Sequence, residues 1–266
     1  MTARLFLATT MFLGTVVSAQ TPAQPAAAPP AQSTTSAPSA SCPEMATALT
    51  ALLGRDTRMR DWAEMARYRD ANKTVVPLAR TDARVVFMGD SITDGWQQPR
   101  YGGFFPGKPY VDRGISGQTT PQMLIRFRQD VIDLKPKVVA ILAGINDIAG
   151  NTGPSSAKMI EDNLASMAQL AKANGIKVVM CSILPAYSFP WRPGINPVPK
   201  VTEVNNWMKE FAAKNNFVYC DYYDAMVDER KGLPANLSKD GVHPTEEGYK
   251  IMEPIVQKAI AKALKK

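Results

Sequence analysis

The hydrophobic positions of the chain gather into five short runs that are rich in β-branched residues. They lie at residues 84–88, 110–112, 137–142, 177–184 and 217–221. Runs of this length and composition predict buried strands, and the segments between them carry helical spacing. Strands that alternate with helices predict a parallel sheet with helices on both faces. The pattern therefore indicates an α/β fold with a five-stranded parallel sheet.

The clearest helical segment runs from residue 155 to residue 174. It begins with serines, ends before Gly175, and carries apolar side chains at helical spacing, namely Ile160, Leu164, Met167 and Ala171. Pro121 suits the first turn of a helix after the second strand. The C-terminal segment has a single apolar stripe, formed by Met252, Val256, Ala259 and Ala263. Helices are therefore predicted after the second, third and fifth strands.

Residues 45–53 and 61–72, ahead of the first strand, also have helical patterns. Within them Trp62, Met65 and Tyr68 are expected to pack back onto the sheet. We interpret this segment, up to about residue 80, as an N-terminal brace and not as a site.

The first 19 residues have the composition of a secretory signal peptide, with Arg4 at a basic start, an apolar run, and small residues before a cleavage point after Ala19. The alternative is a membrane anchor, but the apolar run is short for a bilayer span. Residues 20–43 are almost wholly Pro, Ala, Ser, Thr and Gln, which predicts a flexible tether. We expect a secreted or periplasmic protein, without a stable membrane span after cleavage, whose single domain covers residues 44–266.

The formal charge of +7, or +6 without Arg4, comes from scattered basic residues. No nucleic-acid motif accompanies them, so no nucleic-acid partner is expected, while anionic polymers or phospholipid headgroups stay open. Three cysteines are too few for a disulfide framework. Cys181 and Cys220 are predicted as buried thiols, with a bridge between them as the alternative. The sequence indicates neither a role for Cys42 nor an oligomeric state.

The chain has one histidine, His243, which follows Asp240 by three residues in the loop after the fifth predicted strand. Ser91 follows the first strand. A serine nucleophile needs a base within hydrogen-bond reach and a third group that orients the base. Ser91, His243 and Asp240 can take these roles, and Asp224 is an alternative orienter. Two-histidine zinc sites are excluded, no metal or cofactor is expected, and the interpretation is a hydrolase.

Gly117 and Asn146 follow the second and third strands, so they are expected at the same carboxyl edge of the sheet. Acyl transfer requires donors aimed at the developing oxyanion. The candidates are the backbone N–H groups of Ser91 and Gly117 and the side-chain amide of Asn146. The neighbouring acids are expected to cap helices or to hold structure, namely Asp90, Asp94 and Asp147.

These residues lie in four blocks: GDSI at residues 89–92, GISG at 114–117, GIND at 144–147 and DGVH at 240–243. In all four the chain resembles the GDSL esterase/lipase family in its SGNH hydrolase form, most of all secreted bacterial esterases related to the platelet-activating-factor acetylhydrolase subunits. The resemblance spans about residue 84 to the C-terminus. It implies a flavodoxin-like three-layer α/β/α fold, an exposed serine, no metal, and hydrolysis of carboxylic esters. Asp112 stands where many relatives have asparagine, which affects only local loop hydrogen bonding.

Two loops, residues 96–110 and 186–199, follow strands at the active edge. We predict that their bulky side chains wall the substrate pocket, with plain loop packing as the alternative: Trp96, Phe104, Phe105, Phe189 and Trp191. The expected enzyme is a serine esterase for short acyl groups, with acetyl esters of carbohydrate or related polymers as its expected substrates. A lysophospholipase or thioesterase with the same site is the alternative. A non-catalytic carbohydrate-binding protein is less favoured because Ser91, Asn146 and His243 are all present.

Overall fold

The computed structural model describes residues 41–75 and 83–266. The predicted signal peptide and nearly all of the predicted tether lie outside the described residues. The chain divides into two units, residues 1–46 and 47–266, and helix α1 (Cys42–Arg60) crosses their boundary. The tether prediction is wrong at its end, because α1 already begins at Cys42. The Glu44 carboxylate accepts a hydrogen bond from the Ser41 backbone N–H at 2.7 Å, as in a capping box, and this contact starts the helix.

A five-stranded parallel sheet forms the centre of the second unit, with the strand order β2-β1-β3-β4-β5. The fold prediction is confirmed, although some strand bounds shift by up to three residues. The side chains of β1 and β3 are buried along their whole length, as expected for strands covered on both faces. The strands are β1 (Val85–Gly89), β2 (Tyr110–Gly114), β3 (Val138–Leu142), β4 (Lys177–Cys181) and β5 (Val218–Cys220).

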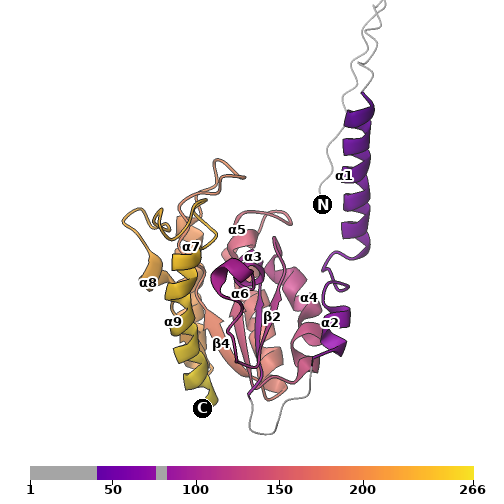
Figure 1. The fold of residues 1–266 in the computed structure, drawn as a ribbon. Coiled ribbons are helices and arrows are strands. Elements are labelled where there is room, and N and C mark those ends of the chain that lie inside the picture. The colour runs from indigo at the N-terminus through magenta and orange to yellow at the C-terminus, as the bar shows by residue number, and fades with distance from the viewer. Residues whose placement is uncertain (1–40, 76–82) are drawn as a thin grey trace, which may run out of the picture. The chain divides into compact units, whose positions relative to one another are not determined.

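Helices cover both faces of the sheet and produce the three layers (Figure 1). On one face α4 (Thr120–Asp130), α6 (Ala157–Ala173) and α7 (Val198–Lys214) pack side by side. On the other, α9 (Glu246–Leu264) packs against β3, β4 and β5, and α3 (Ser91–Trp96) packs against β1 and β2. The apolar stripes predicted for α6 and α9 are buried. Shorter elements are α5 (Ile145–Ile148), α8 (Tyr223–Met226) and two 3₁₀ turns at Pro99–Tyr101 and Ile132–Leu134.

The helix predicted over residues 61–72 is wrong for most of its length. Only α2 (Arg69–Lys73) is helical, and the residues before it form turns. The Asp61 carboxylate accepts hydrogen bonds from the backbone N–H groups of Met65 and Ala66, at 2.8 and 2.9 Å, and Glu64 adopts a φ of 54°. This local bonding competes with helix formation. Tyr68 packs down as expected and donates its hydroxyl to the Gly114 carbonyl, whereas Trp62 is 42% exposed.

A buried arginine, Arg126, connects the carboxyl ends of β1 and β2, the two strands that precede Ser91 and Gly117. Arg126, on α4, is fully buried and forms an ion pair with Asp130 at 3.1 Å. Its guanidinium also donates to the carbonyls of Gly89 and Arg113, at 3.1 and 2.9 Å, and to the Gln118 side chain at 2.6 Å. The ion pair and these hydrogen bonds offset the loss of hydration that a buried guanidinium suffers. Arg126 thereby fixes the carboxyl ends of β1 and β2 relative to each other.

Two further observations on the described residues concern the state of the cysteines and the character of the helices. Cys181 and Cys220 face each other across β4 and β5 as free, buried thiols, so the buried-thiol prediction is confirmed and the alternative of a bridge is not. Cys42 is free and exposed. Over residues 41–75 and 83–266, no helix combines the length and the apolar character needed to cross a membrane.

Candidate active site

Ser91 is the first residue of α3 and comes directly after β1. The Asp90 carboxylate caps the helix by accepting a hydrogen bond from the Ile92 backbone N–H at 2.9 Å. Gly114 lets the first turn of α3 pack against the end of β2, because a Cβ there would lie 2.2 Å from the Asp94 backbone nitrogen. Ser91 is thus half-buried at the carboxyl edge of the sheet, and its backbone N–H lies in the first helical turn, where intrahelical partners are lacking.

The structure brings Ser91, His243 and Asp240 into one hydrogen-bonded chain. The Ser91 Oγ lies 2.9 Å from His243 Nε2, and His243 Nδ1 lies 2.6 Å from Asp240 Oδ2. When Nδ1 carries the proton for Asp240, Nε2 is left as an acceptor for the serine proton. This arrangement can activate a serine for nucleophilic attack.

The loop before α9 holds the carboxylate in place through its second oxygen. Asp240 Oδ1 accepts hydrogen bonds from the backbone N–H groups of Val242 and His243, at 2.9 and 2.8 Å. Burial alone would raise the pKa of Asp240, but these bonds and the bond to the imidazole outweigh it and hold the pKa below its ordinary value. Asp240 therefore stays ionised beside the imidazole. Asp224, the alternative orienter, lies on α8, and the His243 ring nitrogen is bonded to Asp240 instead.

Gly117 and Asn146 belong to one small network in the segments that follow β2 and β3, the two strands on either side of β1. Gly117 has a φ of 79°, a backbone conformation that favours glycine. The Asn146 amide nitrogen donates to the Gln118 carbonyl at 3.0 Å, and its oxygen accepts from the Asn151 amide at 3.0 Å. Asn151 also donates to the Gly117 carbonyl at 3.0 Å. The amide of Asn146 is therefore oriented, and one of its two N–H groups is left for another acceptor.

Three acids near the site serve the structure around it. Burial raises the pKa of Asp90 and of Asp147 to about 6 in each case. Asp90 is the N-cap of α3, and its second oxygen has no hydrogen-bond partner among the described residues. Asp147 accepts from the backbone N–H and the hydroxyl of Thr120, which joins α5 to the start of α4. Asp94 accepts a hydrogen bond from the Ser116 hydroxyl at 2.7 Å and caps no helix.

Asp112 lies one strand away, at a position that the family resemblance singled out. Its Oδ1 accepts from the Gly114 backbone N–H at 2.7 Å, whereas its Oδ2 has no partner among the described residues. Burial raises its pKa to about 7. The effect of the aspartate is therefore local to the end of β2, as expected.

The structure contradicts the substrate-wall prediction for Trp96 and Phe105. Both are 3% exposed, and with Phe104 and Tyr110 they surround Phe87 of β1, at ring-centroid distances of 5.1 to 6.2 Å from it. Phe104 is partly buried in the same cluster. The loop after α3 folds back over the sheet because burying these large rings is more favourable than exposing them.

The second predicted loop does reach the site, through one residue. Trp191 is 42% exposed, and its ring centroid lies 6.0 Å from that of His243. Phe189 is buried beneath it at 5.5 Å and supports it without reaching solvent. Trp191 therefore stays a candidate wall, and Phe189 is a packing residue.

Two open cavities flank the candidate residues. The Trp62 cleft, of about 420 Å³, lies on the Gly117 side, and its lining includes Trp62, Glu64, Gly117, Asn151, Thr152 and Arg192. The Tyr101 cleft, of about 390 Å³, lies on the His243 side, and its lining includes Arg100, Tyr101, Lys239, His243 and Glu246. The sequence did not identify Trp62, Arg192 or Asn151 as candidate site residues, because no motif spacing connects them to the four blocks.

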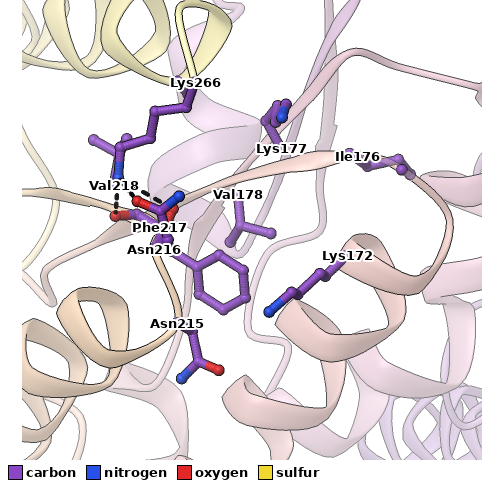
Figure 2. Close-up of a pocket in the computed structure, with 11 residues that line it drawn as sticks. Lys172, Ile176, Lys177, Val178, Asn215, Asn216, Phe217, Val218 and Lys266 are labelled. Carbon is purple, nitrogen blue, oxygen red and sulfur yellow. Dashed lines mark hydrogen bonds between the residues drawn. The ribbon is translucent and has the colours of Figure 1, made fainter.

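A third cavity, of about 230 Å³, lies at the amino ends of β4 and β5, at the opposite edge of the sheet from Ser91 (Figure 2). Lys266 donates there to the Asn216 side chain and to the carbonyls of Asn216 and Phe217, at 2.9 to 3.1 Å. Lys172 lies over the Phe217 ring. The lining residues, all in the described part of the chain, include no carboxylate, thiol, hydroxyl or imidazole side chain. This cavity therefore lacks the groups for ester hydrolysis.

Comparison with known proteins matches residues 87–251 to the model of the GDSL-like lipase/acylhydrolase family. The solved structure of a GDSL-like lipase from Bacteroides thetaiotaomicron is 46% identical, with a TM-score of 0.71 over 76% of this chain and 98% of that chain. A protein of Xylanibacter ruminicola named acetylxylan esterase is 26% identical over 220 residues, 70% of this chain but only 45% of its own length. Another acetylxylan esterase, from Geobacillus stearothermophilus, is 26% identical over 64% of this chain and 90% of that protein. These relatives support the predicted class of enzyme, a carboxylic ester hydrolase.

Proposed function

The chain belongs to the GDSL-like lipase/acylhydrolase family, and on that premise we propose that it is a serine esterase that hydrolyses short-chain acyl esters, acetyl esters of carbohydrate above all. The observation that carries the proposal is the hydrogen-bonded chain from Ser91 through His243 to Asp240, with distances of 2.9 and 2.6 Å. Gly117 and the oriented amide of Asn146 form a linked network in the segments after β2 and β3, the strands on either side of β1.

The proposed reaction proceeds in two steps. Ser91 Oγ attacks the ester carbonyl carbon while its proton passes to His243 Nε2, and the oxyanion that forms faces the N–H groups of Ser91, Gly117 and Asn146. The carbon–oxygen bond then breaks, and the alcohol leaves with the proton from Nε2. Water attacks the acyl-enzyme in the same manner, which releases the carboxylic acid and restores Ser91. Asp240 stabilises the imidazolium that forms in each step.

The lining of the two clefts supports a short acyl group. Apart from the rings of Trp62 and Tyr101, most side chains that line the two clefts are polar or charged. Among the described residues, the clefts therefore offer a long acyl chain no aliphatic side chain to pack against except that of Pro244, and each methylene that stays unburied forgoes about 0.8 kcal/mol. The acetylxylan esterase relatives support the same substrate class.

A purified-enzyme panel of p-nitrophenyl esters, from acetate to palmitate, tests the proposal. We expect kcat/KM to fall steeply beyond about four acyl carbons. Rising kcat/KM from butyrate to laurate, below micelle-forming concentrations, would favour a lysophospholipase or thioesterase. Ser91→Ala should lose nearly all activity, and a serine-reactive phosphonate should label Ser91. Labelling at another residue would overturn the assignment of the nucleophile.

We also propose that the enzyme is exported. The support is the composition of residues 1–19, which lie outside the described residues. Mass spectrometry of the protein recovered from its native host should find a mature N-terminus at Gln20. An intact Met1 on the recovered protein would contradict cleavage.

A further inference from the structure

The Trp62 cleft is built by a segment that lies outside the region matched by the family model, residues 87–251. Trp62 and Glu64 come from the turns before α2, whereas Gly117, Asn151 and Arg192 come from loops at the carboxyl edge of the sheet. The cleft thus joins the N-terminal segment to the loops that carry the proposed oxyanion donors. Its volume of about 420 Å³ suits a monosaccharide or disaccharide unit.

Side-chain hydrogen bonds to backbone carbonyls hold this segment against the start of α4. Gln122 donates to the Trp62 carbonyl at 2.6 Å, and Gln118 donates to the Ala63 carbonyl at 2.9 Å. Farther along the segment, Gln129 donates to the Met65 carbonyl at 2.6 Å. The backbone of Trp62 is therefore held at the cleft, while the residue as a whole is 42% exposed.

One of these glutamines, Gln118, connects the cleft to the proposed catalytic groups. The Gln118 carbonyl accepts the amide of Asn146, and the Gln118 side chain is held by buried Arg126. Asn151, which lines the cleft, bonds to both Asn146 and Gly117. A molecule in the cleft would therefore contact Gly117, one of the proposed oxyanion donors, and Asn151, which is bonded to Asn146.

The chemistry of the lining matches a sugar ring better than an acyl chain. An exposed indole offers a flat apolar surface for the C–H face of a pyranose, and polar groups around it can bond to the hydroxyls at the ring's edge. Glu64 supplies an acceptor and Arg192 supplies donors. The side-chain oxygen of Asn151 is a further acceptor, since both N–H groups of its amide already bond to Gly117 and Asn146. An acyl chain would leave these polar groups without partners.

We infer that the Trp62 cleft is a glycan-binding subsite, in which a sugar unit of an acetylated oligosaccharide stacks on Trp62 and hydrogen-bonds to Glu64 and Arg192. The inference rests on the proposed function, because it assigns the non-reacting part of that substrate to a place beside Ser91. Binding energy from this remote part of the substrate would raise the specificity for acetylated glycans over simple acetate esters.

The test compares an acetylated xylooligosaccharide with ethyl acetate, whose leaving group is too small to reach the cleft. p-Nitrophenyl esters are unsuitable because their aromatic leaving group could itself stack on Trp62. We expect Trp62→Ala to lower the ratio of the two kcat/KM values at least about fivefold, with Trp62→Phe restoring part of the loss. Trp207→Ala, at a tryptophan on α7 away from both clefts, is the matched control and should leave the ratio unchanged.

Arg192→Ala provides a second variant at an exposed side chain, where truncation removes no core packing. It should lower the ratio in the same direction. Isothermal titration of the Ser91→Ala enzyme with an unacetylated xylooligosaccharide should detect binding that Trp62→Ala abolishes. The inference would be overturned if the ratio of kcat/KM for the acetylated xylooligosaccharide to kcat/KM for ethyl acetate stayed unchanged in both Trp62→Ala and Arg192→Ala. Ethyl esters of longer acids serve as a further set of substrates. A loss of activity confined to these esters would also overturn the inference, because it would show that the cleft binds the acyl chain. Failure of the wild-type enzyme to hydrolyse either ester would instead reject the proposed function.

Discussion

Replacing Asp240 by asparagine separates the orientation of His243 from the folding of its loop. Asp240 Oδ1 accepts two backbone N–H groups at 2.8 and 2.9 Å, while Oδ2 accepts the imidazole Nδ1–H at 2.6 Å. In Asp240→Asn the amide oxygen can keep the two backbone bonds, so its NH₂ group must face Nδ1. The imidazole then carries its proton on Nε2, which can no longer accept the proton of Ser91.

The expected loss follows from the wrong tautomer. In a Ser-His-Asp triad this change lowers kcat about 10⁴-fold, which corresponds to about 5.5 kcal/mol of transition-state stabilisation. The loop keeps its backbone bonds, so the free energy of unfolding should fall by less than about 1.5 kcal/mol. Asp240→Ala should lose a similar share of the rate, but it also leaves the N–H groups of Val242 and His243 without an acceptor, at about 1–3 kcal/mol each.

The assay is kcat/KM for p-nitrophenyl acetate, combined with urea unfolding of each variant. Asp224→Asn, on an exposed carboxylate of α8, is the matched control and should change neither quantity. The reasoning would be refuted if Asp240→Asn kept more than a tenth of the activity, or if it destabilised the fold as much as Asp240→Ala.

Four further changes test other parts of the structure. Asn146→Ala should lower kcat by about two to three orders of magnitude with little change in KM, since its amide would bond mainly to the transition state, and steady-state kinetics check this. His243→Gln should remove most activity, because glutamine cannot take the Ser91 proton, and near-normal steady-state kinetics in this variant would assign the base to another group. Burial raises the pKa of Asp112 from 3.8 to about 7, so ionisation of this carboxylate lowers the stability of the wild type as pH rises through that range. In urea unfolding, the free energy of unfolding of Asp112→Asn should therefore exceed that of the wild type by up to ~4 kcal/mol at pH 8 and should equal it below pH 4. Arg126→Met should destabilise the protein by about 3–5 kcal/mol because it leaves the buried Asp130 carboxylate with the Asn72 amide but without a cation, and a loss below 1 kcal/mol in the same assay would contradict that account.

The sheet could be predicted from the sequence because its strands are buried on both faces. Continuous apolar runs mark β1 and β3, and the periodic stripe of α6 identifies its buried side. Helix α7 was not predicted, because prolines at 197 and 199 and the polar loop before them mask its start. Residues 61–68 form turns instead of the predicted helix, because the Asp61 carboxylate binds two backbone N–H groups that a helix would otherwise use.

The meeting of the four blocks could also be predicted, because the carboxyl ends of parallel strands share one edge of the sheet. The substrate walls could not, since the direction of a ring is invisible in a sequence. Trp96 and Phe105 are large and follow a strand at the active edge, yet they pack onto Phe87. The role of Trp62 in a cleft depends on bonds from Gln118 and Gln122, more than 50 residues away along the chain. No local pattern encodes such contacts.

The chain's one histidine makes the candidate site directly observable by spectroscopy. In protein labelled with ¹⁵N-histidine, every imidazole resonance comes from His243, so no assignment step is needed. The Nδ1 proton, held in the 2.6 Å bond to Asp240, should resonate far downfield of the amide region, and the two nitrogen shifts report which tautomer is present. Binding of a phosphonate at Ser91 and occupation of the Tyr101 cleft, which His243 lines, can therefore each be followed as the movement of one signal, in the intact enzyme and without any turnover.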